Sequence, residues 1–81
     1  MIAETISTKQ ESKDVFIVKI KVDGREYQDR FSLGGLKIAI KKETNEDSLG
    51  YIIRAAMIKA AEDKIKLKKE TSNVRKISKQ N

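Results

Sequence analysis

The sequence predicts an α+β domain, in which a three-stranded antiparallel β-meander is followed by one long C-terminal α-helix packed on the sheet. Three observations predict this class: a segment that alternation makes apolar on one face, two glycine-containing turn signals after it, and a long region of helical periodicity without proline. A chain of 81 residues is long enough for one small domain, which is marginally stable by itself.

The first predicted strand is the segment 15–22, in which apolar and basic side chains alternate. Its apolar face consists of Phe16, Val18, Ile20 and Val22. Asp23-Gly24 follows, and both residue types tolerate the positive φ that a two-residue hairpin turn requires. Closing the hairpin there pairs Phe16 with Phe31 and brings apolar side chains onto a common face, so the pattern and the turn predict the same register.

Gly34-Gly35 indicates a second hairpin turn. Pairing Leu33 with Leu36 across it makes residues 36–41 the third strand of the meander. Residues 2–9 also alternate weakly and offer a fourth strand. The polar segment 9–14 predicts a loop.

The long helix is predicted to begin at Thr44 or Asn45, either of which can cap its N-terminus. It runs without a breaker to about Glu70, where Thr71–Asn73 offers a stop. A helix of about 25 residues is on the order of 37 Å long, whereas an eight-residue strand reaches only about 27 Å. We therefore expect the C-terminal end of the helix to project beyond the sheet.

The formal net charge of +6 is concentrated at the C-terminus. Residues 1–63 hold 11 basic and 11 acidic side chains, whereas residues 64–81 hold seven basic side chains and one acidic one. The sequence thus predicts a domain at residues 1–70 and a basic, disordered tail at residues 71–81. Such a tail would neutralise phosphates without reading base sequence, and its affinity would fall steeply with salt.

The outward face of the predicted sheet is also basic. By alternation it displays Lys19, Lys21, Gln28, Arg30, Lys37 and Lys41, opposed by Glu26. Such a face could contact phosphates or enter the major groove, and the alternative is a solvated sheet whose lysines limit aggregation. Three strands backed by a helix, with a basic sheet face, are similar in element order to small DNA-binding domains at the start of some phage and transposon integrases. No motif accompanies this similarity, so it assigns no residue roles.

These two basic regions together predict a nucleic-acid-binding surface. Its candidate residues are Lys19, Lys21, Arg30, Lys37, Lys41, Lys64, Lys66, Lys68, Lys69, Arg75 and Lys76. We expect a small non-enzymatic accessory or regulatory protein, of a kind that phages or mobile elements encode, which contacts phosphates through the outer sheet face and the C-terminal tail.

The predicted helix is apolar on two sides. The stripe expected to cover the sheet consists of Leu49, Ile53, Ala56, Ala60 and Leu67, flanked by Ile52 and Met57. The opposite stripe consists of Tyr51, Ala55, Ile58, Ala61 and Ile65. A second apolar side needs its own cover, which predicts a homodimer through the helix, although the N-terminal segment or a bend of the sheet could cover it instead. The matching function is a dimeric protein-interaction module, such as an inhibitor or adaptor acting on a host protein.

The composition argues against an enzyme. The chain has no Cys and no His, so it lacks disulfides, thiol nucleophiles and imidazole acid–base groups. Gly34-Gly35 lacks the further glycines and the Lys-Ser/Thr of a phosphate loop. Adjacent carboxylates such as Glu46 and Asp47 would point about 100° apart on a helix. We expect no catalytic, cofactor-binding or metal-binding residue and no small-molecule substrate.

A cytoplasmic location is also expected. The N-terminal residues have neither the basic region nor the apolar region of a secretory signal. The longest apolar stretches, Val15–Val18 and Ala55–Ile58, are far shorter than the roughly 20 residues needed to span a bilayer. We therefore expect no membrane partner.

Overall fold

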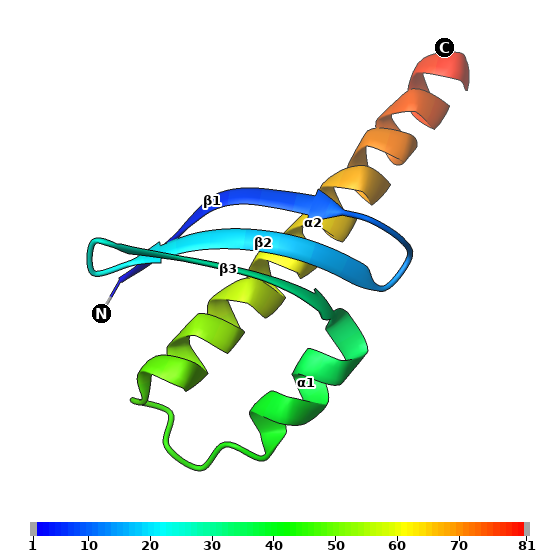
Figure 1. The fold of residues 1–81 in the computed structure, drawn as a ribbon. Helices are drawn as coiled ribbons and strands as arrows, with labels where there is room; N and C mark the ends of the chain where they lie inside the picture. The colour runs from blue at the N-terminus through cyan, green and yellow to red at the C-terminus, as the bar shows by residue number, and fades with distance from the viewer. Residues whose placement is uncertain (1, 81) are drawn as a thin grey trace.

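The computed structural model describes the backbone of residues 2–80 and the side chains of residues 2–67. Its elements are β1 (Ala3–Gln10), β2 (Val15–Val22), β3 (Arg25–Ser32), α1 (Leu33–Lys41) and α2 (Leu49–Gln80). The three strands form an antiparallel meander in the order β1-β2-β3. Both helices pack on one face of this sheet and leave the other face open (Figure 1). The predicted α+β class is confirmed.

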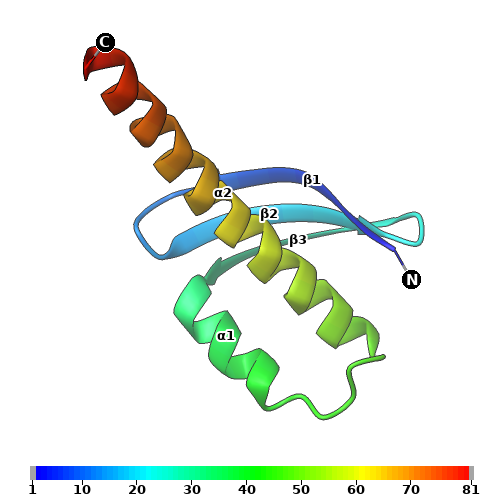
Figure 2. The same ribbon diagram turned by 180° about the vertical axis from the view of Figure 1, so that it is seen from behind.

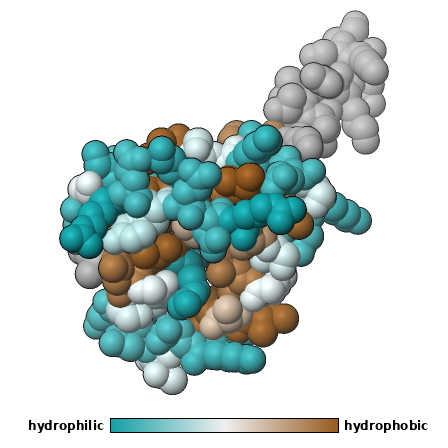
Figure 3. Space-filling model, viewed as in Figure 1, coloured by the Kyte–Doolittle hydropathy of each residue, from teal (hydrophilic) through white to brown (hydrophobic). Residues whose placement is uncertain are grey.

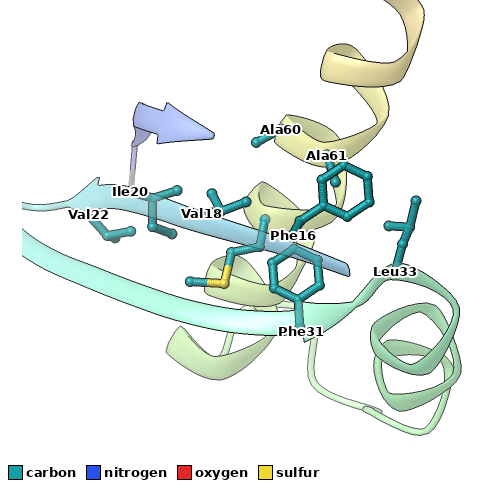
Figure 4. Close-up of a cluster of buried hydrophobic side chains, with 9 residues drawn as sticks. Phe16, Val18, Ile20, Val22, Phe31, Leu33, Ala60 and Ala61 are labelled. Atoms are coloured by element: carbon teal, nitrogen blue, oxygen red, sulfur yellow. The ribbon is translucent and has the colours of Figure 1, made fainter. Parts of the chain in front are cut away.

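The core lies between the inner face of β2 and the middle of α2. Its members are Phe16, Val18, Ile20 and Val22 of β2, Phe31 of β3, Leu33 of α1, and Met57, Ala60 and Ala61 of α2. Figure 4 shows the side chains from the sheet and those from the helices pointing toward one another. The rings of Phe16 and Phe31 stack with their centroids 6.3 Å apart. Ala60 and Ala61 are small, so the α2 backbone can approach the strand closely.

The hairpin between β2 and β3 has the predicted turn and register. Asp23 and Gly24 have φ values of 49° and 84°, as in a type I′ turn. The strands pair without interruption, and Phe16 lies opposite Phe31 as expected. The local turn chemistry and the apolar alternation therefore determine this part of the fold together.

The N-terminal segment forms a full strand, β1, which pairs antiparallel with β2. The register shifts between Thr5 and Ser7, so Ile6 is the extra residue of a β-bulge there, and its side chain is 45% exposed. The weak apolar alternation of this segment is explained by its position at the edge of the sheet, where most of its side chains face solvent.

The prediction that residues 36–41 form a strand is wrong, because Leu33–Lys41 is the helix α1. Ser32 caps this helix, and its Oγ accepts a hydrogen bond from the backbone N–H of Gly35 at 3.1 Å. Gly34-Gly35 therefore lies in the first turn of a helix rather than in a hairpin turn.

Asp14, in the loop between β1 and β2, explains why α1 starts where it does. Its backbone carbonyl accepts a hydrogen bond from the N–H of Leu33 at 2.8 Å, and its carboxylate accepts one from the N–H of Gly34 at 3.3 Å. The first N–H groups of a helix have no partner within the helix, so a distant acceptor stabilises this start. Leu33, Leu36 and Ile40 then follow a helical spacing and form the more buried side of α1.

The predicted start of the long helix at Thr44 or Asn45 is also wrong. The side chain of Asn45 accepts a hydrogen bond from the N–H of Asp47 and stabilises a turn, whereas Ser48 Oγ accepts one from Tyr51 at 3.1 Å. Ser48 therefore caps α2, which begins at Leu49.

The helix α2 extends well past the strands, as expected (Figures 1 and 2). It has 32 residues and does not end at the predicted stop at Thr71–Asn73, since it continues to Gln80. The predicted division between residues 1–70 and a disordered tail at residues 71–81 falls where the side chains lie outside the described residues, and it stays a prediction. Within the part of the chain that the structure describes, no helix combines the length and the apolar character needed to cross a membrane.

The two glycines of α1 provide a paired test of its cap. A Cβ at position 34 would meet only Asp14 Oδ2 at 3.8 Å, whereas one at position 35 would lie 2.6 Å from Ser32 Oγ. We expect Gly34→Ala to raise the free energy of unfolding by up to about 1 kcal/mol through helix propensity. Gly35→Ala should be about 1 kcal/mol less stable than Gly34→Ala, because Ser32 must leave its capping position. Chemical denaturation measures both, and a destabilised Gly34→Ala would contradict the helix.

Candidate nucleic-acid and protein interfaces

The outward sheet face is less basic than predicted. Lys37 and Lys41 lie on α1 and are therefore absent from this face. The register places on it Glu4, Ser7 and Lys9 of β1, Val15, Ile17, Lys19 and Lys21 of β2, and Glu26, Gln28, Arg30 and Ser32 of β3. Four basic side chains thus share the face with two acidic ones.

Two of these four cations form ion pairs within the chain. Lys19 Nζ lies 3.0 Å from Glu26 Oε1, and Arg30 pairs with Glu11 of the loop between β1 and β2. Among the residues with described side chains, Lys9 and Lys21 form no ion pair and are exposed. The sheet face therefore offers two unpaired cations to an anionic partner, where the sequence predicted five.

Lys19 also affects the protonation of its partner. The hydrogen bond from the Lys19 ammonium, together with its charge, holds the pKa of the Glu26 carboxyl below its ordinary value, and the charge of Lys21 adds to this. The pair joins neighbouring strands on the outward face and is well exposed, so it contributes little to stability.

Two cations of the helical layer are also paired, whereas Lys41, Lys42 and Lys59 form no ion pair with any residue whose side chain is described. Lys37 of α1 lies 3.0 Å from Glu62 of α2, and Arg54 of α2 lies 3.5 Å from Glu43 of the connecting loop. These contacts place Lys37 beside α2, where it lines a hollow together with Lys66.

The predicted basic segment begins on the part of α2 that leads away from the sheet (Figure 2). Lys64 and Lys66 are exposed and form no ion pair with any residue whose side chain is described. The side chains of Lys68, Lys69, Arg75 and Lys76 lie outside the described residues, so their part in the surface stays a prediction.

The buried side of α2 lies between the two predicted apolar stripes. Met57, which was expected at the margin, is 3% exposed, whereas Leu49 and Leu67, expected to cover the sheet, are 41% and 61% exposed. Ala61, from the stripe assigned to a second copy, is completely buried in the core. The helix is therefore rotated relative to the prediction, and both stripes contribute to packing within one chain.

The remaining residues of the predicted interface are half-buried. Ile58 and Ile65 pack against the core, and Ile65 lines a hollow beside Leu33 of α1. Tyr51 and Ala55 are also half-buried. The sequence predicted a strand where α1 lies, so it did not predict that α1 covers part of this stripe. The homodimer through α2 stays a prediction, but the intramolecular packing accounts for much of the pattern that suggested it.

A second surface, which the sequence did not suggest, lies below the edge strand β3. A hollow of about 320 Å³ opens there, and its apolar lining comes from Tyr27, Leu36, Ile53 and Met57, with Arg54 beside them. Figure 3 shows hydrophobic surface gathered in this region, below the strands and among the helices. The hollow lies where β3, α1 and α2 meet, since Leu36 belongs to α1 whereas Ile53 and Met57 belong to α2. Its prediction would have required the correct assignment of α1.

No family model matches the chain, and neither a curated protein nor a solved structure matches it. Among the residues with described side chains, no three acidic groups come together in a way that could hold a metal ion. The surfaces of the domain are therefore the features from which a function can be inferred.

Two alanines of the predicted interface stripe test the rotation of α2. Ala61 is completely buried, whereas Ala55 is half-exposed and does not belong to the core. We expect Ala61→Leu to lower the free energy of unfolding by about 1–3 kcal/mol through overpacking. Ala55→Leu should leave it within about 0.5 kcal/mol of the wild type. Thermal or chemical unfolding provides the comparison, and equal effects would show that α2 has a different orientation.

The ion pair on the outward face predicts a change in titration. Replacing Lys19→Gln removes the hydrogen bond and the charge that lower the pKa of Glu26, so this pKa should rise toward its ordinary value. In the wild type, the pair's contribution to stability is present at neutral pH and is lost as the pH falls through the lowered pKa. An NMR titration of the Glu26 side chain measures the change, with Lys9→Gln as a control that should leave this pKa unaltered.

Proposed function

We propose that the protein is a small non-enzymatic nucleic-acid-binding protein that contacts the phosphate backbone through the C-terminal part of α2, with a smaller contribution from the outward sheet face. One observation carries the proposal: positive charge is separated from the body of the domain. Residues 1–63 balance their charges, whereas residues 64–81 hold seven basic side chains and one acidic one. This basic segment begins where α2 leaves the sheet (Figure 1).

The ion pairs of the body support this separation. Lys19, Arg30, Lys37 and Arg54 each have a carboxylate partner within the chain, so binding a phosphate there would require an existing pair to break. Lys64 and Lys66 have no such partner among the residues with described side chains. Association at the end of α2 would release condensed counterions from the nucleic acid without that cost.

The type of cation predicts the kind of recognition. Six of the seven basic residues in 64–81 are lysines, and Arg75 is the exception. Lysine acts as a point charge on phosphate, whereas the planar guanidinium of arginine donates two hydrogen bonds to the edge of guanine. No aromatic residue follows Tyr51, so this segment cannot stack on unpaired bases. Binding is therefore expected to be sequence-independent and strongly dependent on salt.

On the outward face, Lys9 and Lys21 supply the auxiliary contacts. Both are exposed and lack an ion pair among the described side chains. Lys19 and Arg30 contribute less, because Glu26 and Glu11 already neutralise them. Of the cations predicted for this face, Lys21 is the one that remains available.

Two variants of equal net charge test the proposal. The first carries Lys→Gln at positions 64, 66, 68 and 69. The second carries Lys→Gln at positions 13, 42 and 59 together with Arg25→Gln, all exposed in the body. Fluorescence anisotropy with a labelled DNA duplex is measured between roughly 50 and 200 mM salt. The first variant should bind at least about tenfold more weakly, and its salt slope should fall by about 0.9 for each phosphate that the protein no longer neutralises.

The body variant should stay close to the wild type in affinity and in salt slope. Equal reductions in the two variants would show that only the net charge matters and would contradict a binding surface on α2. A wild-type chain that fails to bind duplex at low salt would remove the proposal altogether.

A protein-interaction module is the second candidate, and the hollow below β3 favours it. The apolar side chains of Tyr27, Leu36, Ile53 and Met57 line this hollow beside an edge strand, an arrangement that suits a protein partner better than a phosphate backbone. The duplex titration separates the two candidates, because a module acting only on protein would not bind duplex with a slope set by positions 64–69.

A further inference from the structure

The two edges of the sheet differ in how far they are protected from pairing with another strand. The edge strand β1 carries a bulge at Ile6, and bulges interrupt the hydrogen-bonding row that a second strand would need. The edge strand β3 pairs with β2 over all eight of its residues without a register shift. It also contains neither proline nor lysine, the residues that commonly block edges.

The geometry of the hairpin determines which backbone groups of β3 point away from the sheet. Val22 and Arg25 flank a two-residue turn and therefore form a hydrogen-bonded pair. By alternation, the backbone N–H and C=O groups of Glu26, Gln28 and Arg30 point outward at the edge. The N–H of Arg30 agrees with this direction, since it is bonded at 2.9 Å to the side chain of its neighbour Asp29 and not to β2. Pairing with a second strand exchanges this local hydrogen bond for one to the second copy.

The charges on β3 are complementary to a second copy of the same strand. An antiparallel pair must place residues of the same face opposite each other, so only registers that differ by two residues are available. When Gln28 lies opposite Gln28 of the second copy, Glu26 lies opposite Arg30 of the second copy, and Arg30 opposite its Glu26. This register places two symmetry-related pairs of opposite charge across the interface. Glu26 and Arg30 keep their partners Lys19 and Glu11 within each chain, so Lys19, Glu26, Arg30 of the second copy and its Glu11 follow one another with alternating charge.

The neighbouring registers are less favourable. A shift in one direction places Asp29 opposite Asp29 of the second copy, and a further shift places Arg30 opposite Arg30. Like charges directly opposite each other are destabilising. A shift in the other direction also forms two pairs of opposite charge, Arg25 with Asp29, but it pairs only residues 25–29. The register centred on Gln28 pairs residues 25–31 and therefore forms the longer ladder.

We propose that the protein forms a symmetric dimer by antiparallel pairing of β3 with β3 of a second copy, in the register centred on Gln28. The two sheets join into one sheet of six strands, and the two-fold axis passes between the two Gln28 residues, perpendicular to the sheet. The helical layers of both copies then lie on the same side, so the hollows lined by Tyr27 and Ile53 approach each other beneath the joined strands. This interface is distinct from the predicted helix stripe around Ile58.

The absence of native cysteine makes a crosslinking test specific. In the proposed register the Cα atoms at position 28 are about 5.5 Å apart, within the range that a disulfide bridges. Gln28→Cys should crosslink rapidly under mild oxidation or with a short bis-maleimide, and its rate should rise with the dimer population. Lys21→Cys, on the outward face of the central strand, is the matched exposed control and should crosslink much more slowly.

Other single cysteines on β3 report the register. A cysteine at position 29 lies opposite position 29 of the second copy only in the register that places Asp29 opposite Asp29. A cysteine at position 27 lies opposite position 27 of the second copy only in the register that pairs residues 25–29. The proposal therefore predicts faster crosslinking at position 28 than at position 27 or 29. Faster crosslinking at either neighbour would overturn the proposed register.

Charge reversal tests the same interface without crosslinking. Arg30→Glu converts both pairs of opposite charge into like pairs and should weaken dimerisation about tenfold or more in sedimentation equilibrium. The double variant Glu26→Arg/Arg30→Glu restores opposite charges across the interface and should recover most of the affinity. Lys19→Gln, which removes the partner of Glu26 within the chain, should not weaken the dimer.

Two outcomes would overturn the proposal. One is a chain that remains monomeric at the highest accessible concentration while positions 28 and 21 crosslink equally slowly. The other is a dimer that is unaffected by Arg30→Glu but is disrupted by Ile58→Glu, which would place the interface on α2.

Discussion

The burial of the inner face of β2 is the constraint on which the rest of the structure depends. Phe16, Val18 and Ile20 are completely buried, and each large apolar side chain removed from water contributes about 1.5–3 kcal/mol. The facing part of α2 approaches closely because Ala60 and Ala61 are small. The stabilising contacts therefore concentrate on one side of a three-stranded sheet, and the outward face is left to polar and charged side chains.

This one-sided packing determines where partners can bind. Ion pairs occupy much of the charge on the outward face and between the helices, whereas the basic segment of α2 extends away from the sheet. The uninterrupted strand β3 remains at an edge. The proposed nucleic-acid contact and the proposed dimer use different surfaces, so the two can coexist in one assembly. In a dimer through β3, the basic ends of the two α2 helices lie toward opposite ends of the joined sheet, because α2 leaves each sheet on the side of β1 (Figure 1).

Sequence reasoning succeeded where neighbouring residues determine the conformation. The turn at Asp23-Gly24 and the register of β2 with β3 follow from turn chemistry and strict alternation. It failed at α1, where Gly34-Gly35 and the alternation of Leu36, Ile38 and Ile40 favoured a strand locally. The helix is stabilised there by Asp14, which lies 20 residues from Gly34 in sequence and cannot be recognised as an acceptor from a local pattern.

The candidate surfaces show the same division. The sequence by itself determined the alternation of the strands, the hairpin register and the concentration of charge at the C-terminus, because each depends on residue order or residue count. Only the tertiary structure decided the rotation of α2, the burial of Ala61 and the hollow below β3. The same holds for the ion pairs of Lys19 with Glu26 and of Arg30 with Glu11. The hollow depends on where α1 packs, and the other features depend on which side chains the folded chain brings into contact.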